Sequence, residues 1–528
     1  MLHTNLSSAP RINPAWCDSV GDCPYPENGS SLSTLTTETQ RYNVAVIIKL
    51  LSPVIIPFIL ILLSKFMWQE YIITTSDHLI SKPLPPGSMG FPIIGETLQF
   101  LIQGLNFNKI RRNKHGNVFK THIFGRPTIR AIGAGNVRKI LQGENTLVIS
   151  ELPASARLLL GDGSLSQTTG KCHLRRKKAI IKAFTYTALS SYVPTIQRIV
   201  RSYIGNWCNR RQLLACPEIK ILTFDVTCKV LAGFDIDEKE CHRLETVFET
   251  FISGLFSLSV KIPLLGMRKA LRARDELLHK IGECIQKKRE SEDLAHASDA
   301  LSYLMEVDGP DKLSLTELQE TCLELLFAGH ETTASAASFL MMQLGKREDL
   351  KSRIKNELAE NGVHDSIHGN DLDFETISRL HTVKNVVKEV LRLSPPVGSG
   401  FRKVIQTFEL EGFQIPKGWK VAYSIRDTHE MSHTFDSPDD FDPDHWNSVV
   451  DDRYEFLPFG GGKRMCPGKE LAMLFLKIFA IELSRCSTWT LQNETTSFRS
   501  FPIPFPADDL PIKFLGSSEK FRGRLCTV

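Results

Sequence analysis

The sequence predicts a mainly α-helical fold with a smaller β region, preceded by an N-terminal transmembrane helix. Three observations carry this prediction. Apolar residues recur mostly with a helical period over roughly 250 residues beyond Ile132. Residues 118–124 and 128–132 alternate in the manner of two strands that turn at Gly125–Pro127. Residues 44–63 form the most apolar stretch of the chain.

Size and composition limit the possible classes of function. At 528 residues and 42% hydrophobic, the chain can bury a large core. The net charge of +5 gives no global basic field, so binding to nucleic acid is not expected. The 12 cysteines include no Cys-x-x-Cys pair and no regular spacing, which indicates neither a zinc site nor a disulfide scaffold. Most cysteines are expected to be reduced and buried, as in a domain that faces the cytosol.

Residues 1–43 are polar and poor in aliphatic side chains, which predicts a disordered tail. The triplets that begin at Asn5 and Asn28 are acceptor sequences for N-glycosylation, although such triplets arise often by chance. Cys17 and Cys23 are close enough in sequence to pair if the tail meets an oxidising lumen. The tail alone proves little, and its luminal location is the expectation that accompanies a membrane anchor after it.

Residues 44–66 are expected to anchor the chain in a membrane. About 20 apolar residues span a bilayer, and this stretch just reaches that length, although a lysine and two prolines interrupt it. It lies too deep in the chain for an ordinary signal peptide, and a buried core helix is the alternative. Lys65, Trp68 and Tyr71 follow it, as interfacial anchors do. Residues 67–82 are then a linker to a globular domain over 83–528.

The most informative stretch is Phe459-Gly-Gly-Gly-Lys-Arg-Met-Cys-Pro-Gly468, which precedes a long apolar-periodic segment. Its glycines let successive backbone N–H groups converge on one anion. We expect that anion to be the thiolate of Cys466, at a helix N-terminus and beside Arg464, where dipole and charge lower the pKa of a thiol. Without such neighbours, a cysteine is by default a small buried hydrophobe.

The spacing F-x-x-G-x-R-x-C-x-G is filled here by Phe459, Gly462, Arg464, Cys466 and Gly468. It resembles the haem-ligating loop of the cytochrome P-450 superfamily. The resemblance implies the fold of that superfamily and a haem b whose iron is bound by Cys466, since a cysteine ligand favours cleavage of the O–O bond. It also implies that Phe459 and Arg464 belong to the haem site.

A second motif, Ala328-Gly-His-Glu-Thr-Thr333, lies inside a long helical pattern from Asp311 to about Lys346. Thr332 can donate a hydrogen bond to a carbonyl one turn earlier and bend the helix. The alternative is a buried helix with an incidental glycine and threonine. In the resembling superfamily, A-G-x-[DE]-T-T is the groove in which oxygen is activated, which implies that Glu331 and Thr332 are the catalytic pair that relays protons.

Glu389 and Arg392 lie three residues apart, on one face of a predicted helix. Such a pair usually lies on a surface and contributes less than about 1 kcal/mol. Its apolar neighbours favour burial instead, and it matches the E-x-x-R of the superfamily, a structural pair that fixes the scaffold of the cysteine loop. The third member of that network is normally an arginine. His445 stands at its position, and it is a shorter donor that can be neutral at pH 7.

The resemblance also implies residues that bind the haem propionates. His173 and Lys177 stand at the two positions of the family's Trp-x-x-x-Arg and keep a donor at each, although such a charge run is usually a solvated face. Arg402 stands where the family places another propionate-binding arginine. The cations around Lys177, with Lys463 and Lys469, are expected to form a docking surface for an acidic electron donor.

Several longer stretches resemble the animal branch of the superfamily that hydroxylates retinoic acid: 85–99, 121–128, 327–337, 415–419 and 509–511. This branch implies oxidation of all-trans retinoic acid, chiefly at ring C4, in an apolar pocket. Phe327 and Val397 are the expected pocket residues, and Arg130 is the candidate that attracts the carboxylate. Leu152 replaces a tryptophan of the branch's substrate-covering loop. This departure leaves a sterol or another terpenoid as the alternative substrate.

The sequence therefore predicts a single-pass haem-thiolate monooxygenase of the endoplasmic reticulum membrane, with its catalytic domain, 83–528, facing the cytosol. It is expected to use O2 and to take electrons from NADPH through a separate NADPH-cytochrome P-450 reductase, because no flavin or dinucleotide motif occurs in the sequence. A haem-thiolate isomerase or dehydratase is one rival, against which the pair Glu331 and Thr332 argues. A non-catalytic retinoid or haem binder, which needs neither that pair nor a reductase, is the other.

Overall fold

The computed structural model describes residues 32–74, 77, 80–255, 265–290, 299–363, 372–448, 454–500 and 502–515. The chain divides into two compact units, residues 1–67 and 68–528. Asn5 and Asn28, the predicted glycosylation sites, and the predicted pair Cys17 and Cys23 lie outside the described residues.

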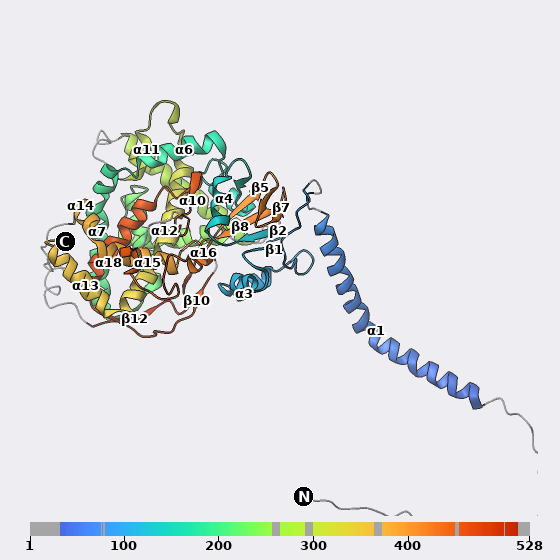
Figure 1. The fold of residues 1–528 in the computed structure, drawn as a ribbon. Helices are drawn as coiled ribbons and strands as arrows, with labels where there is room; N and C mark the ends of the chain where they lie inside the picture. The colour runs from blue at the N-terminus through green and yellow to red at the C-terminus, as the bar shows by residue number, and fades with distance from the viewer. Residues whose placement is uncertain are drawn as a thin grey trace, which may run out of the picture. The chain divides into compact units, whose positions relative to one another are not determined.

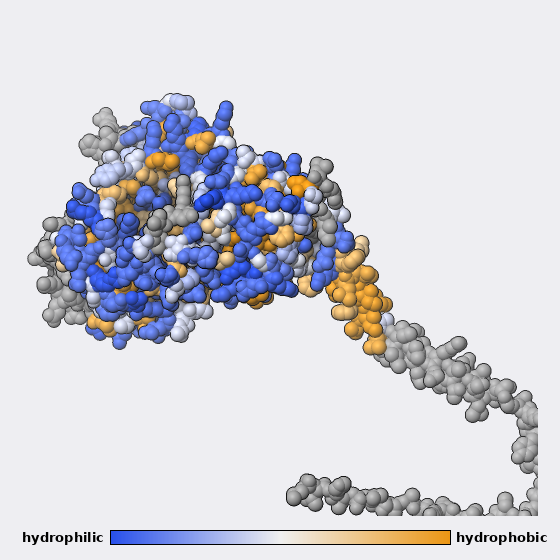
Figure 2. Space-filling model, in the orientation of Figure 1, coloured by the Kyte–Doolittle hydropathy of each residue, from blue (hydrophilic) through white to orange (hydrophobic). Residues whose placement is uncertain are grey.

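Helix α1 (Leu32–Ile73) is longer than the predicted membrane anchor at both ends. The predicted disordered tail is therefore wrong for residues 32–43, and residues 67–73 are helical and not linker. No glycine or proline interrupts residues 32–43, and extending a nucleated helix costs little. Residues 51–71 have a mean hydropathy of 2.0 and none of them is buried, so this segment has the length and composition of a membrane span (Figure 2).

The second unit is dominated by helices. Their bounds are α2 (Thr97–Gln103), α3 (Asn106–His115), α4 (Ala134–Gln142), α5 (Ala154–Leu160), α6 (Gly170–Lys182), α7 (Tyr186–Arg210), α8 (Ala215–Val230), α9 (Glu238–Leu255), α10 (Leu265–Glu290), α11 (Ala300–Met305), η2 (Gly309–Asp311), α12 (Leu315–Lys346), α13 (Glu348–Glu360), α14 (Phe374–Arg379), α15 (His381–Leu393), α16 (Arg426–Glu430), α17 (His445–Ser448), η3 (Gly462–Arg464) and α18 (Lys469–Cys486).

The strands are short. Their bounds are β1 (Val118–Ile123), β2 (Arg126–Ala131), β3 (Val148–Ser150), β4 (Gln212–Leu214), β5 (Ser399–Val404), β6 (Phe408–Leu410), β7 (Phe413–Ile415), β8 (Lys420–Ser424), β9 (Trp489–Leu491), β10 (Phe498–Arg499), β11 (Phe505–Pro506) and β12 (Pro511–Phe514). The largest sheet has the order β1-β2-β8-β5-β3, in which only β2 and β8 pair in parallel. The predicted strand pair, β1 and β2, is confirmed. Strands β6 and β7 form a further antiparallel pair.

Helix α12 organises the helical part of this unit. It begins with a capping box, in which Ser314 and Glu317 each accept the other's backbone N–H. It packs against α8, α10, α15 and α18, and its apolar side chains join the largest core cluster. Figure 1 shows α12, α15 and α18 together in the helical part, with β1, β2, β5 and β8 gathered at one side.

The two faces of the large sheet carry different residues. Paired residues on neighbouring strands share a face, and successive residues alternate between faces. The register therefore places Ile129, Val421 and Arg402 on one face. Ile129 and Val421 join the core cluster that includes side chains of α4. By the same register, Arg130 and Phe401 lie on the opposite face.

Candidate functional site

The cysteine-containing loop leads directly into helix α18, as the sequence predicts. Gly462 has a φ of +65°, and a Cβ there would lie 2.8 Å from the carbonyl oxygen of Leu141, so this position requires glycine. The N–H of Cys466 donates to the carbonyl of Phe459 over 3.0 Å and closes the loop. Both residues remain partly accessible to solvent.

The electrostatic surroundings of Cys466 differ from the prediction. Burial raises the pKa of the Cys466 thiol, while the N–H of Gly468 and the charge of Lys177 act in the opposite direction. The prediction that Arg464 lowers this pKa is therefore wrong, because Arg464 turns to other partners. A thiol of this kind becomes a thiolate when it binds a metal cation, whose positive charge stabilises the deprotonated sulfur.

Arg464 and Arg402, both predicted to bind haem, share one buried carboxylate. The Nε of Arg402 donates to Oε2 of Glu144 over 2.9 Å, and the Nε of Arg464 donates to Oε1 over 3.0 Å. Glu144 is 1% exposed. The sequence analysis missed it, since its two partners follow it by 258 and 320 residues and no local pattern marks it.

Helix α6 supplies the two remaining candidates for propionate binding. His173 is buried, and burial together with the charges of Arg464 and Lys177 lowers its pKa to about 4. It is therefore neutral at pH 7 and has a single N–H to donate. The ammonium of Lys177 donates to the carbonyls of Lys463 and Met465, at 2.9 and 3.0 Å. Lys177 thereby ties α6 to the cysteine loop.

One residue in the middle of α12 is exposed, although the helix is otherwise largely buried there. Ala328 is exposed, although Leu326 and His330 beside it are buried. The hydroxyl of Thr332 donates to the carbonyl of Ala328 over 2.7 Å, which confirms the predicted bond to the preceding turn. Phe327 and Thr332 are half-buried on the same part of the helix. This face of α12 is therefore accessible at the motif that the sequence singles out.

Glu331, the second member of the predicted catalytic pair, is held by an ion pair. It is 7% exposed, and its Oε1 lies 2.9 Å from the Nζ of Lys220 on α8. Lys220 also approaches Glu249 of α9, at 3.6 Å. Burial lowers the pKa of the neighbouring His330 to about 3, so that imidazole stays neutral. Lys220 was not identified from the sequence, because it lies 111 positions before its partner.

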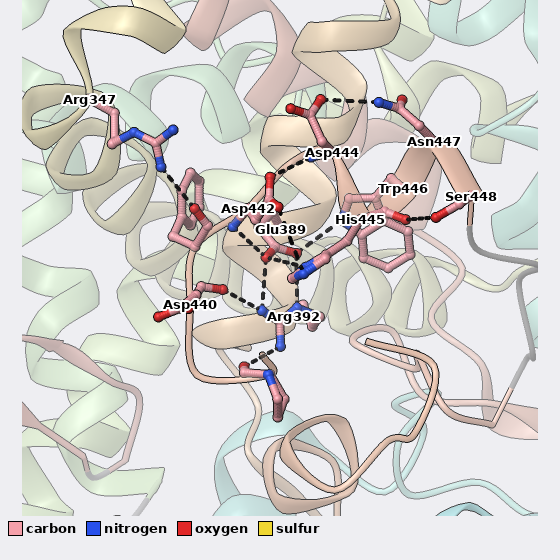
Figure 3. A network of polar contacts seen from close by, with 12 residues as sticks. Arg347, Glu389, Arg392, Asp440, Asp442, Asp444, His445, Trp446, Asn447 and Ser448 are labelled. Carbon is pink, nitrogen blue, oxygen red and sulfur yellow. Dashed lines mark hydrogen bonds and ion pairs between the residues drawn. The ribbon is translucent and has the colours of Figure 1, made fainter. Parts of the chain in front are cut away.

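Glu389 and Arg392 form the predicted buried pair on α15, and Figure 3 shows them at the centre of a polar network. They are 0% and 1% exposed, and the Nε and Nη2 of Arg392 donate to the carboxylate over 2.9 and 2.8 Å. The Nδ1 of His445 lies 3.3 Å from the same carboxylate. The Nε1 of Trp446 donates to it over 3.0 Å, a contact that the sequence analysis missed.

The predicted substrate residues are scattered over different elements. Leu152 lies between β3 and α5, where it packs against the large core cluster with Phe327 of α12. Val397 precedes β5 and is 45% exposed. Arg130 is 2% exposed and donates through Nε to Asn108 over 3.1 Å. Burial lowers the pKa of Arg130 to about 10, while the charge of Asp427 opposes this shift.

The comparison with protein-family models decides the family. The cytochrome P450 model matches residues 85–501. The chain belongs to the cytochrome P450 family. It is a monooxygenase of the haem-thiolate type, with the mainly helical fold of that family.

Similar cytochromes P450 occur in several vertebrates. The chain is 43% identical to cytochrome P450 26B1 of Xenopus tropicalis over 468 residues, which cover 87% of this chain and 92% of the relative. It is 41% identical to cytochrome P450 26A1 of Danio rerio over 478 residues, or 88% of this chain and 97% of the relative. A solved structure described as retinoic acid bound cyanobacterial CYP120A1 matches with a TM-score of 0.75 and 36% identity, covering 83% of this chain and all of that one.

The residues of this cytochrome P450 fit a haem. Cys466 is half-buried in its loop, and Ala328 is an exposed residue on α12 within the motif Ala328–Thr333. Arg402, Arg464 and Lys177 place three cations near this loop, which suits a ligand that carries two carboxylates.

Proposed function

We propose that this cytochrome P450 hydroxylates all-trans retinoic acid, chiefly at ring C4, and so inactivates it. The observation that carries the proposal is the similarity to a solved structure that holds retinoic acid, at 36% identity over the whole of that chain. The similarity to cytochromes P450 26A1 and 26B1 agrees with the resemblance that the sequence motifs indicate.

The cofactor would be haem b, whose iron Cys466 would bind and whose propionates Arg402, Arg464, His173 and Lys177 would hold. When bound, the haem supplies the activation of O2 that inserts one oxygen atom into a C–H bond. The protein supplies the position of the substrate and the delivery of protons. Thr332 offers its hydroxyl at the accessible face of α12. Glu331, which is paired with Lys220, is the second member of the proposed proton relay.

Electrons come from NADPH through a separate flavoprotein reductase, which docks on an exposed basic surface. Lys463 and Lys469 are exposed beside the cysteine loop, and Lys178 is exposed on α6. An acidic partner would be attracted to this surface.

Helix α1 anchors the enzyme in the endoplasmic reticulum membrane, with the tail in the lumen and the catalytic domain in the cytosol. The apolar segment 51–71 supports the anchoring.

The substrate is a lipophilic acid that enters an apolar site. Phe327, Leu152 and Val397 are candidates to contact its polyene or ring. Recognition of the carboxylate by Arg130 stays a prediction. Its Nη1 has no hydrogen-bond partner among the described residues, but its position on the sheet face opposite to Arg402 separates it from the propionate candidates. If Arg130 recognises the carboxylate, replacing it by glutamine lowers the affinity for retinoic acid and leaves that for retinol unchanged.

A binding titration of the haem-loaded protein tests the proposal. Retinoic acid should shift the Soret absorption, and addition of reductase should then couple NADPH consumption to a ring-hydroxylated product. A shift with a sterol and none with saturating retinoic acid would contradict the substrate. Product formation without NADPH would identify an isomerase or dehydratase, and binding without turnover in the presence of reductase would identify a carrier.

A further inference from the structure

Glu144 occupies an unusual position for an acidic residue. It follows helix α4, and its side chain is buried with a relative exposure of 1%. One carboxylate oxygen accepts from the Nε of Arg402, and the other accepts from the Nε of Arg464 and, at 3.3 Å, from the backbone N–H of Ser150. A strand of the large sheet and the cysteine loop are thus joined through one side chain.

Both arginines are oriented by this carboxylate in the same way. A guanidinium carries five N–H donors. Besides its Nε, Arg402 uses one Nη1 donor on the carbonyl of Phe401 and one Nη2 donor on the hydroxyl of Tyr423, at 2.8 and 3.4 Å. Arg464 likewise uses Nη1 and Nη2 on two carbonyls. Each guanidinium therefore keeps further Nη donors in the described part of the chain, while its Nε is fixed.

The charges around Glu144 do not balance. Arg464 is cationic and is faced by the cation of Arg402 and by the carboxylates of Glu144 and Glu324, and Lys177 adds a third cation beside Arg464. Burial raises the pKa of Glu324, which weakens its share of the compensation. This buried cluster has a net positive charge, and uncompensated buried charge is costly. An anionic ligand would remove that cost.

We propose that Glu144 is a positioning residue for haem, which holds Arg402 and Arg464 by their Nε atoms so that their free Nη donors meet the propionates. The inference rests on the assignment of this site to haem. Glu144 does not itself contact the haem. Its negative charge reduces the repulsion between the two guanidiniums and keeps them at a fixed separation. It also adds a negative charge to the loop that carries Cys466, and negative charge beside the iron that Cys466 would bind disfavours the reduced state.

The full-length haem protein with Glu144→Gln tests this role, because glutamine keeps the shape and removes the charge. We expect the iron's midpoint potential to shift to a more positive value and haem transfer to apomyoglobin to become several-fold faster. Glu144→Asp, which keeps the charge, should leave the potential near that of the unchanged protein. The control is Glu151→Gln, since Glu151 is half-buried and its lysine contacts are long, at 3.8 and 3.7 Å. It should change neither quantity.

Unchanged potential and haem transfer in a folded Glu144→Gln protein would overturn the proposal. If Glu144→Gln does not fold, the midpoint potential of Glu144→Asp tests the proposal instead. A shifted midpoint potential in Glu144→Asp, which keeps the charge, would overturn the proposal. These measurements need no substrate, so their failure leaves the retinoic acid assignment standing. Failure of the unchanged chain to take up haem would instead overturn the proposed function.

Discussion

The indole nitrogen of Trp446 lies 3.0 Å from Oε2 of Glu389, inside a network whose third member is normally an arginine in the family. Glu389 also accepts from Arg392 and, at 2.9 Å, from the backbone N–H of Asp442. His445 contacts it at the longer distance of 3.3 Å. Trp446 therefore provides a neutral donor that offsets the weaker contact of His445.

Replacing Trp446 by phenylalanine should lower the free energy of unfolding by about 1.5–3 kcal/mol, because a hydrogen bond to a buried carboxylate is lost. The measurement is chemical denaturation monitored by circular dichroism. Trp489→Phe is a control, since Trp489 is also buried but its Nε1 has no hydrogen-bond partner among the described residues. Equal losses for the two variants would show that ring volume, and not the bond to Glu389, accounts for the effect.

Replacing His445 by alanine should cost less, about 1 kcal/mol, because its contact with Glu389 is longer and four other N–H donors to Glu389 remain. The same denaturation experiment measures it. A loss for His445→Ala that exceeds the loss for Trp446→Phe would mean that the histidine, and not the indole, is the principal substitute for the missing arginine.

Glu245 on α9 should make stability depend on pH. Burial, and then the charges of Glu249 and Glu331, raise its pKa to about 7, against the opposing charge of Lys220. Between the ordinary value of 4.5 and about 7 the folded state holds a proton that the unfolded state has lost. The stability that Glu245 contributes to the folded state is therefore fully present below pH 4.5 and is lost as pH rises through 7.

Glu245→Gln should therefore be more stable than the unchanged protein at pH 8, and the difference should shrink as pH falls to 4.5. Thermal unfolding at several pH values measures it. If the stability difference between Glu245→Gln and the unchanged protein did not depend on pH, the raised pKa of Glu245 would be contradicted. If Glu245→Gln were less stable than the unchanged protein at pH 8, the predicted direction of the pKa shift would be wrong.

Replacing Lys220 by methionine should destabilise the protein by about 1–3 kcal/mol. The buried carboxylate of Glu331 would lose its partner, and the cost lies below that of a fully buried pair because Lys220 is partly exposed. Lys220→Arg, which keeps the charge, should retain most of the stability. Chemical denaturation of both variants measures their free energies of unfolding. If Lys220→Arg were as unstable as Lys220→Met, loss of the charge pair with Glu331 could not be the cause.

The parts of the site that could be predicted are those encoded within a few residues. The cysteine loop, the bond from Thr332 to Ala328 and the buried pair of Glu389 and Arg392 all follow from local spacing. The partners of Glu144 and Glu331 could not be predicted, because each ion pair joins residues more than 100 positions apart. Arg464 shows the consequence, since its side chain turns to Glu144 and leaves Lys177 as the cation that acts on Cys466.

The same distinction between local and long-range contacts applies to the fold. Alternation along the sequence was enough to predict the pairing of β1 with β2, which are adjacent in the chain. The parallel pairing of β2 with β8 brings together residues almost 300 positions apart, as Thr128 and Lys420 show, and no local pattern encodes it. The start of α1 at Leu32 was missed because residues 32–43 are mostly polar, which indicated disorder, although they contain no glycine or proline.

The most direct test of the central claim is the absorption spectrum of the reduced, carbon monoxide-treated protein. We predict the red-shifted Soret band that marks a thiolate ligand of haem iron, its loss in Cys466→Ala, and its retention in Cys172→Ala, which removes an exposed cysteine of the same chain. A Cys466→Ala protein that kept this band, or an unchanged protein that bound haem without showing it, would contradict the assignment of Cys466 as the iron ligand.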